Sequence, residues 1–94
     1  MSKYKVAASS RFKRDVKRLT RRGYDIEILK GIVLQLADGK TLPPKNEDHP
    51  LKGKWAKYRE CHVKPDWLLV YKVDNGTLTL VLSRTGTHSD VFDL

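Results

Sequence analysis

Hydrophobic spacing in the first half of the chain changes from strand-like to helix-like. Residues 3–8 alternate polar and apolar side chains, which predicts a short strand. Apolar positions then recur at helical spacing after the serines at 9–10, which can cap a helix, and Gly23 can end it. A second helical stripe follows Asp25 and stops at Gly39. The pattern predicts a strand and then two helices that form a hairpin.

The second half of the chain has the period-two spacing of a sheet. Residues 38–57 are polar and contain three prolines, which predicts a long loop of the kind that is often functional in a small domain. Three strands are predicted after it, at residues 58–63, 67–73 and 77–84. Asn75-Gly76 is a hairpin-turn signal, and residues 85–94 read as a tail. The order βααβββ predicts an α+β fold, with a two-helix hairpin packed on one face of a mostly antiparallel sheet.

Length and composition limit the class of protein. The chain has 94 residues, 39% of them hydrophobic and 32% charged, which fits a single globular domain over residues 1–94. No apolar stretch approaches the roughly 18 to 20 residues that cross a membrane, and the first residues lack the apolar core of a secretory signal. Cys61 is the only cysteine, so no internal disulfide can form. These features predict a cytoplasmic protein.

The charge is strongly basic and is concentrated in two segments. Nineteen Lys and Arg against eleven Asp and Glu give a formal net charge of +8, which predicts a polyanionic partner: nucleic acid, the ribosome or an acidic protein. Residues 11–22 hold seven basic residues and one acid, Asp15, and a solvated helix face explains them equally well. Residues 52–59 hold four basic residues and no acid beside the histidines, which favours a track for phosphates.

All three histidines lie in the second half of the chain, each near an acid or an arginine: His49, His62 and His88. Imidazole gives and takes protons near neutral pH. In a basic protein, this grouping suggests proton transfer on a phosphodiester, with a cation to offset the charge that develops on the phosphate. RNA carries its own nucleophile, the 2′-hydroxyl, so this chemistry requires no metal and no cofactor.

Strand pairing gives a reason for the dispersed residues to meet. If Asn75-Gly76 is a two-residue loop, Trp67 faces Arg84 on the neighbouring strand. If Lys64-Pro65 is another, the predicted row across three strands is His62, Trp67 and Arg84. His88 and Asp66 would lie at the same end of the sheet. A slip of one residue would turn His62 to the other face.

Other kinds of site fit the sequence less well. A single histidine in a small basic protein is more often a surface residue than a catalyst. Cysteine and histidine lack the paired spacing of a structural zinc site, so no metal site is predicted. There is no Gly-x-Ser-x-Gly and no P-loop, and Cys61 is best read as a small apolar residue. Trp55 and Trp67 are able to stack on bases, but Trp67 is as readily explained as core.

Specific motifs in the second half resemble the YafQ-type branch of the RelE/ParE toxin superfamily. They begin with His49-Pro50-Leu51, Gly53, Trp55 and Tyr58-Arg59. They continue with His62-Val63, Pro65-Asp66-Trp67-Leu68-Leu69 and Tyr71-Lys72, and end with Arg84-Thr85-Gly86-Thr87-His88 and Phe92. Over residues 1–47 the match is one of pattern only. The resemblance implies a RelE-like, microbial-RNase-like fold.

The resemblance also implies a function. Such a protein is the toxin of a type II toxin–antitoxin system, with a cognate antitoxin, the ribosome and mRNA as partners. Members of this branch cleave mRNA in the ribosomal A site without a metal or a cofactor. The 2′-hydroxyl attacks the phosphate and leaves a 2′,3′-cyclic end.

Carried over by motif, the implied catalytic residues are His49, His62, Asp66, Arg84 and His88. The implied RNA-binding residues are Lys52, Lys54, Arg59, Trp67 and Phe92. His88 is expected to be the general acid, and Arg84 to offset charge on the phosphate. The base remains open between Asp66 and His49, with His62 orienting or assisting.

Two other functions stay as alternatives. A ParE-like inhibitor of DNA gyrase belongs to the same superfamily, but it needs no set of histidines and arginine. A basic RNA-binding module without activity would bind RNA with a strong dependence on salt and would leave no cyclic-phosphate ends.

Overall fold

The computed structural model describes residues 2–92. Its regular elements are β1 (Lys5–Ala8), α1 (Ser10–Arg21), α2 (Ile26–Ala37), η1 (Pro44–Asn46), β2 (His49–Pro50), η2 (Gly53–Trp55), β3 (Arg59–Lys64), β4 (Trp67–Asp74), β5 (Thr79–Gly86) and α3 (His88–Phe92). The predicted order βααβββ is therefore present. Four elements were not predicted: η1, β2 and η2 lie within the expected loop, and α3 lies within the expected tail.

The two long helices begin and end at the residues that the sequence indicated. The Ser9 hydroxyl accepts a hydrogen bond from the backbone N–H of Phe12 at 3.0 Å, which caps α1. Asp25 caps α2 by accepting the N–H of Glu27. Gly23 between them has φ +86°, a left-handed conformation that suits glycine at the end of a helix. Local sequence thus fixes the helical hairpin.

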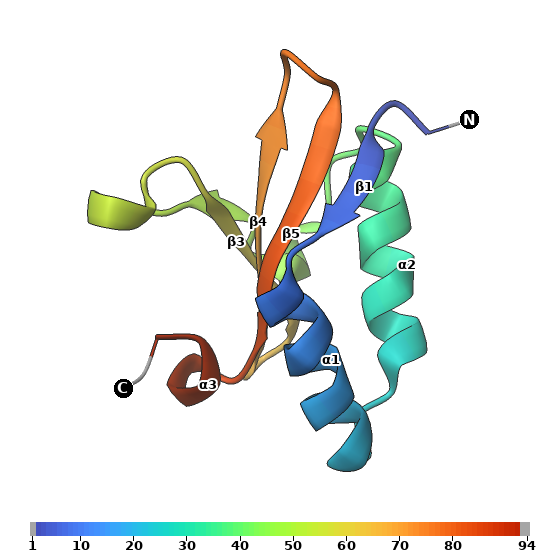
Figure 1. Cartoon of the computed structure of the whole chain (residues 1–94), viewed down its shortest axis with the longest axis vertical. Coiled ribbons are helices and arrows are strands. Elements are labelled where there is room, and N and C mark those ends of the chain that lie inside the picture. Colours follow the sequence, from blue (N-terminus) through green and yellow to red (C-terminus); the bar gives the residue numbers. More distant parts are fainter. Residues whose placement is uncertain (1, 93–94) are drawn as a thin grey trace.

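The sheet has five strands in the order β1-β5-β4-β3-β2. β1 runs parallel to β5, and the other three pairs are antiparallel. Both long helices lie on one side of the sheet (Figure 1). The buried cluster between helices and sheet includes Phe12, Leu19, Leu29, Ile32, Cys61, Leu69 and Leu80. The structure confirms the predicted α+β class, the mostly antiparallel sheet and the burial of Cys61.

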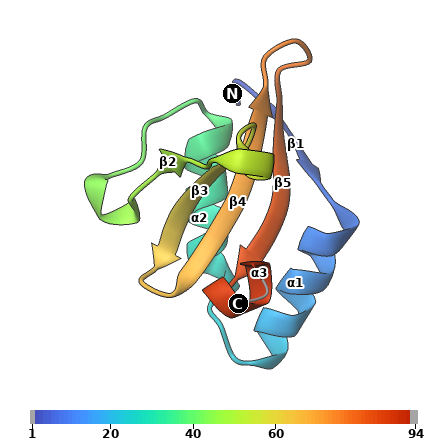
Figure 2. The same cartoon turned by 90° about the vertical axis from the view of Figure 1, so that its left-hand side faces the viewer.

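The opposite face of the sheet is only partly covered. Figure 2 turns this face toward the viewer, with α3 below and the yellow-green η2 turn above. Leu68 and Val70 are fully buried there, and Val91 of α3 is buried as well. We call this side of the sheet the open face, where α3 packs on β4 and β5. No helix within residues 2–92 is long and apolar enough to span a membrane.

The predicted strand register is wrong at the β4–β5 hairpin. Asp74 pairs with Thr79, so residues 75–78 form the loop in place of Asn75-Gly76 alone. The Asp74 carboxylate accepts the N–H groups of Gly76 and Thr77, an Asx-type turn that lengthens the loop. An irregularity between Val70 and Tyr71 then shifts the register again and brings Arg84 opposite Val70.

The predicted register at the β3–β4 turn is also wrong. His62 pairs with Leu68, and Lys64 pairs with Trp67 after an irregularity between His62 and Lys64. The expected row of His62, Trp67 and Arg84 therefore does not exist.

Candidate active site

The true register aligns a different set of side chains across four strands. His49 of β2 lies opposite Glu60 of β3, which lies opposite Val70 of β4, which lies opposite Arg84 of β5. Residues directly opposite one another on neighbouring strands point to the same face of a sheet. The open face thus carries His49 and Arg84 in one row, with Glu60 between them.

Glu60 is the site residue that the sequence analysis missed. Its side chain is only 8% exposed, and its Oε2 lies 3.2 Å from Nε2 of His49. Its Oε1 lies 3.9 Å from Nε2 of His88. Within residues 2–92, Oε1 has no hydrogen-bond partner. The spacing of the sequence could have indicated Glu60. It stands two residues before His62 in the same strand, and residues two apart in a strand point to the same face of the sheet.

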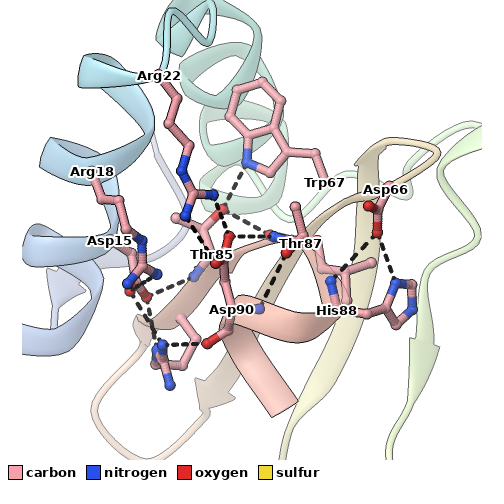
Figure 3. Close-up of polar contacts among 11 residues, drawn as sticks. Asp15, Arg18, Arg22, Asp66, Trp67, Thr85, Thr87, His88 and Asp90 are labelled. Atoms are coloured by element: carbon pink, nitrogen blue, oxygen red, sulfur yellow. Dashed lines mark hydrogen bonds and ion pairs between the residues drawn. The ribbon is translucent and has the colours of Figure 1, made fainter. Parts of the chain in front are cut away.

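His88 is held by the turn that precedes β4. Its Nδ1 lies 3.1 Å from Oδ1 of Asp66, and its backbone N–H donates to the same oxygen at 3.4 Å (Figure 3). These hydrogen bonds hold the pKa of the exposed Asp66 carboxyl below its ordinary value. Asp66 thus holds the ring of His88 by Nδ1 and leaves Nε2 on the side of Glu60.

His62 lies next to His88 but has a different environment. The centres of the two rings are 6.1 Å apart. Nδ1 of His62 lies 3.1 Å from the carbonyl oxygen of Pro65, and 4.0 Å from the Glu47 carboxylate. A carbonyl oxygen only accepts hydrogen bonds, so Nδ1 carries the hydrogen. In the neutral ring, Nε2 is then the unprotonated nitrogen, which is able to take a proton.

His49 has hydrogen-bond acceptors at both ring nitrogens. Nδ1 lies 2.7 Å from the carbonyl oxygen of Glu47, and Nε2 faces Oε2 of Glu60. A carbonyl oxygen only accepts hydrogen bonds, so Nδ1 of His49 carries a hydrogen. The two contacts together fix the orientation of the His49 ring.

Arg84 is fixed by an acid that the sequence analysis did not assign. Its Nε and Nη2 donate to the two carboxylate oxygens of Asp15 at 2.8 and 3.2 Å, and Nη2 also donates to the carbonyl of Asp90. Asp15 is buried and also accepts the backbone N–H of Thr85. The feature of the sequence that could have indicated Asp15 is that it is the single acid among residues 11–22.

Arg84 also lines a cavity of about 340 Å³ on the open face. Other side chains around this cavity are Arg11, Lys54, Trp55, Asp90 and Phe92. The rings of Trp55 and Phe92 meet edge to face at 5.9 Å. The structure thus brings two of the predicted RNA-binding residues, Lys54 and Phe92, to Arg84. Lys52 is exposed in the segment that leads into η2.

Comparison with known proteins agrees with this geometry. The family described as "Bacterial toxin of type II toxin-antitoxin system, YafQ" matches residues 4–93. The chain belongs to the YafQ family of bacterial toxins. It is 39% identical over 88 residues to the mRNA interferase toxin YafQ of Escherichia coli K12, covering 93% of this chain and 94% of that protein.

Solved structures of YafQ-family toxins have the same fold. A metal-bound toxin from Helicobacter pylori is 44% identical with a TM-score of 0.90, covering 95% of this chain and 99% of that one. YafQ in the E. coli DinJ–YafQ toxin–antitoxin complex is 37% identical with a TM-score of 0.87, covering 96% of this chain and 98% of that one.

The metal in the H. pylori toxin raises the question of a metal site in this family member. Within residues 2–92, no group of three or more His, Cys, Asp or Glu side chains is arranged to hold a metal ion.

Trp67 lies in the core between the helices and the sheet. It is 2% exposed, packs edge to face on Tyr24 at 5.0 Å, and donates its indole N–H to Thr85. The Thr85 hydroxyl donates in turn to the carbonyl of Leu68. Because the ring is covered on its faces, Trp67 is a core residue in this structure, and the role that remains predicted for it is to shape the site.

Arg59 is only partly available to RNA. Its Nε donates to the Asp48 carboxylate at 3.2 Å, and the same carboxylate accepts the hydroxyl of Tyr71 at 2.7 Å. Burial, followed by the bond to Asp48, raises the pKa of Tyr71 above its ordinary range. The Arg59 side chain remains 42% exposed, so one side of the guanidinium can still meet a phosphate.

Proposed function

We propose that this chain is an endoribonuclease, the mRNA interferase toxin of a type II toxin–antitoxin pair. It cleaves mRNA in the ribosomal A site by attack of the 2′-hydroxyl, without a metal, and inhibits translation. The observation that carries this proposal is the pair of rings of His62 and His88, 6.1 Å apart on the open face with opposite hydrogen-bond environments. The name of the E. coli relative, mRNA interferase toxin, supports it.

His88 is the general acid in this mechanism. Carboxylates face both of its nitrogens, Asp66 at Nδ1 and Glu60 at Nε2. The distance from Nε2 to Glu60, 3.9 Å, is longer than the distance from Nδ1 to Asp66, 3.1 Å. The proton on Nε2 goes to the 5′-oxygen as its bond to phosphorus breaks.

His62 is the best placed general base. Its Nδ1 is occupied by the Pro65 carbonyl, so Nε2 is left to take the proton of the 2′-hydroxyl. Asp66 is a weaker base because hydrogen bonds from His88 lower its pKa. His49 is less available as a base because both of its ring nitrogens are already engaged, Nδ1 by the carbonyl of Glu47 and Nε2 by Glu60. We therefore assign the role of general base to His62, in place of Asp66 or His49, between which the sequence analysis left it open.

Positive charge on the open face holds the RNA. Arg84, Lys54 and Arg11 surround the cavity beside α3, and a phosphate placed there has its developing charge offset. Phe92 and Trp55 in the same cavity offer ring surfaces to a base. The partners are mRNA and the ribosome, in the cytoplasm. A cognate antitoxin neutralises the toxin, as the DinJ–YafQ toxin–antitoxin complex of the relative suggests.

The test is expression of the chain and of its variants in bacteria. Wild type is expected to arrest translation and to produce new mRNA 5′ ends within codons. His88→Ala should reduce cleavage by about 10²- to 10⁴-fold, the usual contribution of a general acid. Lys40→Ala, a surface change away from the open face, is the control and should stay toxic.

The same experiment separates the competing functions. DNA breaks with intact mRNA would indicate a gyrase inhibitor and would sink the proposal. Binding of RNA without cyclic-phosphate ends would indicate an inactive module. Purified toxin should cleave mRNA on ribosomes and leave the same mRNA intact without them. The rate should also fall at alkaline pH, as the acid loses its proton.

A further inference from the structure

Glu47 has a backbone conformation that residues other than glycine seldom adopt. Its φ is 45° and its ψ is 47°, in the left-handed region where the Cβ atom is crowded. Among residues 2–92, the other non-glycine residue with a positive φ is Leu78, in the β4–β5 loop. Such strain persists only where the surrounding structure holds it, and it is common at functional sites. The conformation of Glu47, which lies beside two histidines, therefore needs an explanation.

The segment that precedes Glu47 is fixed to the sheet. The backbone N–H of Glu47 donates to the carbonyl oxygen of Pro44 at 3.0 Å, which closes η1. Asn46 is buried, and its Nδ2 donates to the backbone carbonyl of His62 at 2.7 Å. η1 is therefore anchored on β3 at the residue proposed as the general base.

The carbonyl of Glu47 contacts the other histidine. This oxygen lies 2.7 Å from Nδ1 of His49, the first residue of β2. The carboxylate of Glu47 is 69% exposed and lies 4.0 Å from Nδ1 of His62, which is too long for a hydrogen bond. The backbone of Glu47, and not its side chain, thus connects the anchored η1 to the ring of His49.

We propose that Glu47 is a positioning residue whose left-handed backbone sets the place of the His49 ring relative to His62. This inference rests on the proposed function, in which His62 takes the proton of the 2′-hydroxyl. His49 lies in the same row of the open face as Arg84, so its ring borders the RNA phosphate. A displacement of about 1 Å at a reacting site can cost about 10²-fold in rate. Glu47 acts on the rate through His49 and touches no reacting atom.

Two substitutions at residue 47 separate the backbone conformation from the carboxylate. Glu47→Gly and Glu47→Val both remove the carboxylate. Glycine adopts a positive φ readily, whereas a β-branched residue with a positive φ is an outlier. Leu78→Gly and Leu78→Val are the matched controls, because they make the same exchange at a φ of 50° in the loop that follows β4. That loop and the β3–β4 turn beside the histidines lie at opposite ends of β4.

NMR of the free full-length chain measures the contact directly. The nitrogen chemical shifts of the His49 ring show which nitrogen carries a hydrogen. In wild type, Nδ1 should carry one in the charged and in the neutral ring, because a carbonyl oxygen only accepts. Glu47→Gly should keep this hydrogen, and Glu47→Val should release it to exchange between the two nitrogens. A neutral wild-type ring with its hydrogen on Nε2 would overturn the proposal, whether or not any variant folds.

Single-turnover cleavage on programmed ribosomes gives a second readout. At saturating toxin, Glu47→Val should lower the rate by about 10- to 100-fold, because the ring of His49 is displaced. The toxin concentration that gives half of the maximal rate should change little, since the basic residues that hold the RNA are untouched. Glu47→Gly should cleave nearly as fast as wild type, as should both Leu78 variants.

The other outcomes contradict the proposal. An equal loss in Glu47→Gly and Glu47→Val would assign the effect to the carboxylate. An unchanged rate in Glu47→Val, or an equal loss in Leu78→Val, would show that the conformation at residue 47 has no special role in cleavage. If Glu47→Val does not fold, Glu47→Gly decides, because a loss of its cleavage or of its Nδ1 hydrogen is incompatible with positioning by the backbone. If wild type does not cleave at all, the proposed function fails, and the NMR measurement still decides whether Glu47 holds His49.

Discussion

Two polar networks share one end of the sheet and differ in the lengths of their polar contacts. The first is the arginine network, Asp15, Arg18, Arg84 and Thr85, in which the buried carboxylate of Asp15 accepts four hydrogen bonds of 2.8 to 3.2 Å. The second is the histidine cluster, His49, Glu60, His62, Asp66 and His88, which contains contacts of 3.9 and 4.0 Å. Figure 3 shows the Asp15 side and the Asp66–His88 pair on either side of Thr87 and Asp90.

The difference follows the task of each network in the proposed reaction. A cation that offsets phosphate charge has to stay charged and in place, which a saturated buried pair achieves. Groups that move protons need access to the substrate, and the side chains of His49 and His88 are 48% and 47% exposed. In the proposed reaction, the fixed cation Arg84 and the histidines that transfer protons thus belong to separate networks at one end of the sheet.

Breaking the arginine network should have the largest effect on stability. Asp15→Ala leaves the guanidinium of Arg84 nearly buried without its partner, which typically costs about 3–5 kcal/mol. Urea unfolding measures this loss. The control is Asp38→Ala at the exposed end of α2, where about 0.5 kcal/mol or less is expected. A loss below about 1 kcal/mol in Asp15→Ala would show that the network is not a structural anchor.

The sequence predicted the elements of the fold but not the alignment of the active site. Helical stripes, caps and period-two strands are local, so they could be read directly. The strand register could not be read from the sequence. The Asp74 carboxylate lengthens the turn, and the irregularity near Val70 changes which residues share a face. The sequence motif predicted His62 and His88 as site residues, while the contacts of Glu60 and Asp15 become visible only when the strands are aligned.

Removing the hydroxyl of Thr85 should have an intermediate effect. Thr85→Val keeps the volume but leaves the indole N–H of Trp67 and the carbonyl of Leu68 without partners in the core. We expect a loss of about 1–3 kcal/mol in urea unfolding and a shift in tryptophan fluorescence. Thr20→Val, whose hydroxyl is exposed on α1, serves as the control and should change little. Unchanged stability in Thr85→Val would mean that Trp67 is held by packing alone.

Asp90 lies between the two networks and should give the smallest effect. Its carboxylate pairs with Arg22 at 2.8 Å and accepts the N–H of Thr87, the residue before His88. The bond from Arg22 is the main cause that lowers the pKa of Asp90 from 3.8 to about 2. A carboxyl with a lowered pKa stabilises the fold above its unfolded pKa and loses that contribution as the pH falls through its folded pKa.

Asp90→Asn removes the charge and keeps an acceptor for Thr87. Because solvent screens the pair, we expect Asp90→Asn to lower the Tm by about 2–4 °C above pH 4. The difference from wild type should disappear as the pH falls from about 4 to 2, where wild type also loses the charge. Asp74→Asn, in the distant hairpin loop, is the control for a general effect of removing an acid. A Tm difference that persists at pH 2 would show that Asp90 acts through its geometry, and α3 would then be anchored by hydrogen bonds in the same way as Arg84.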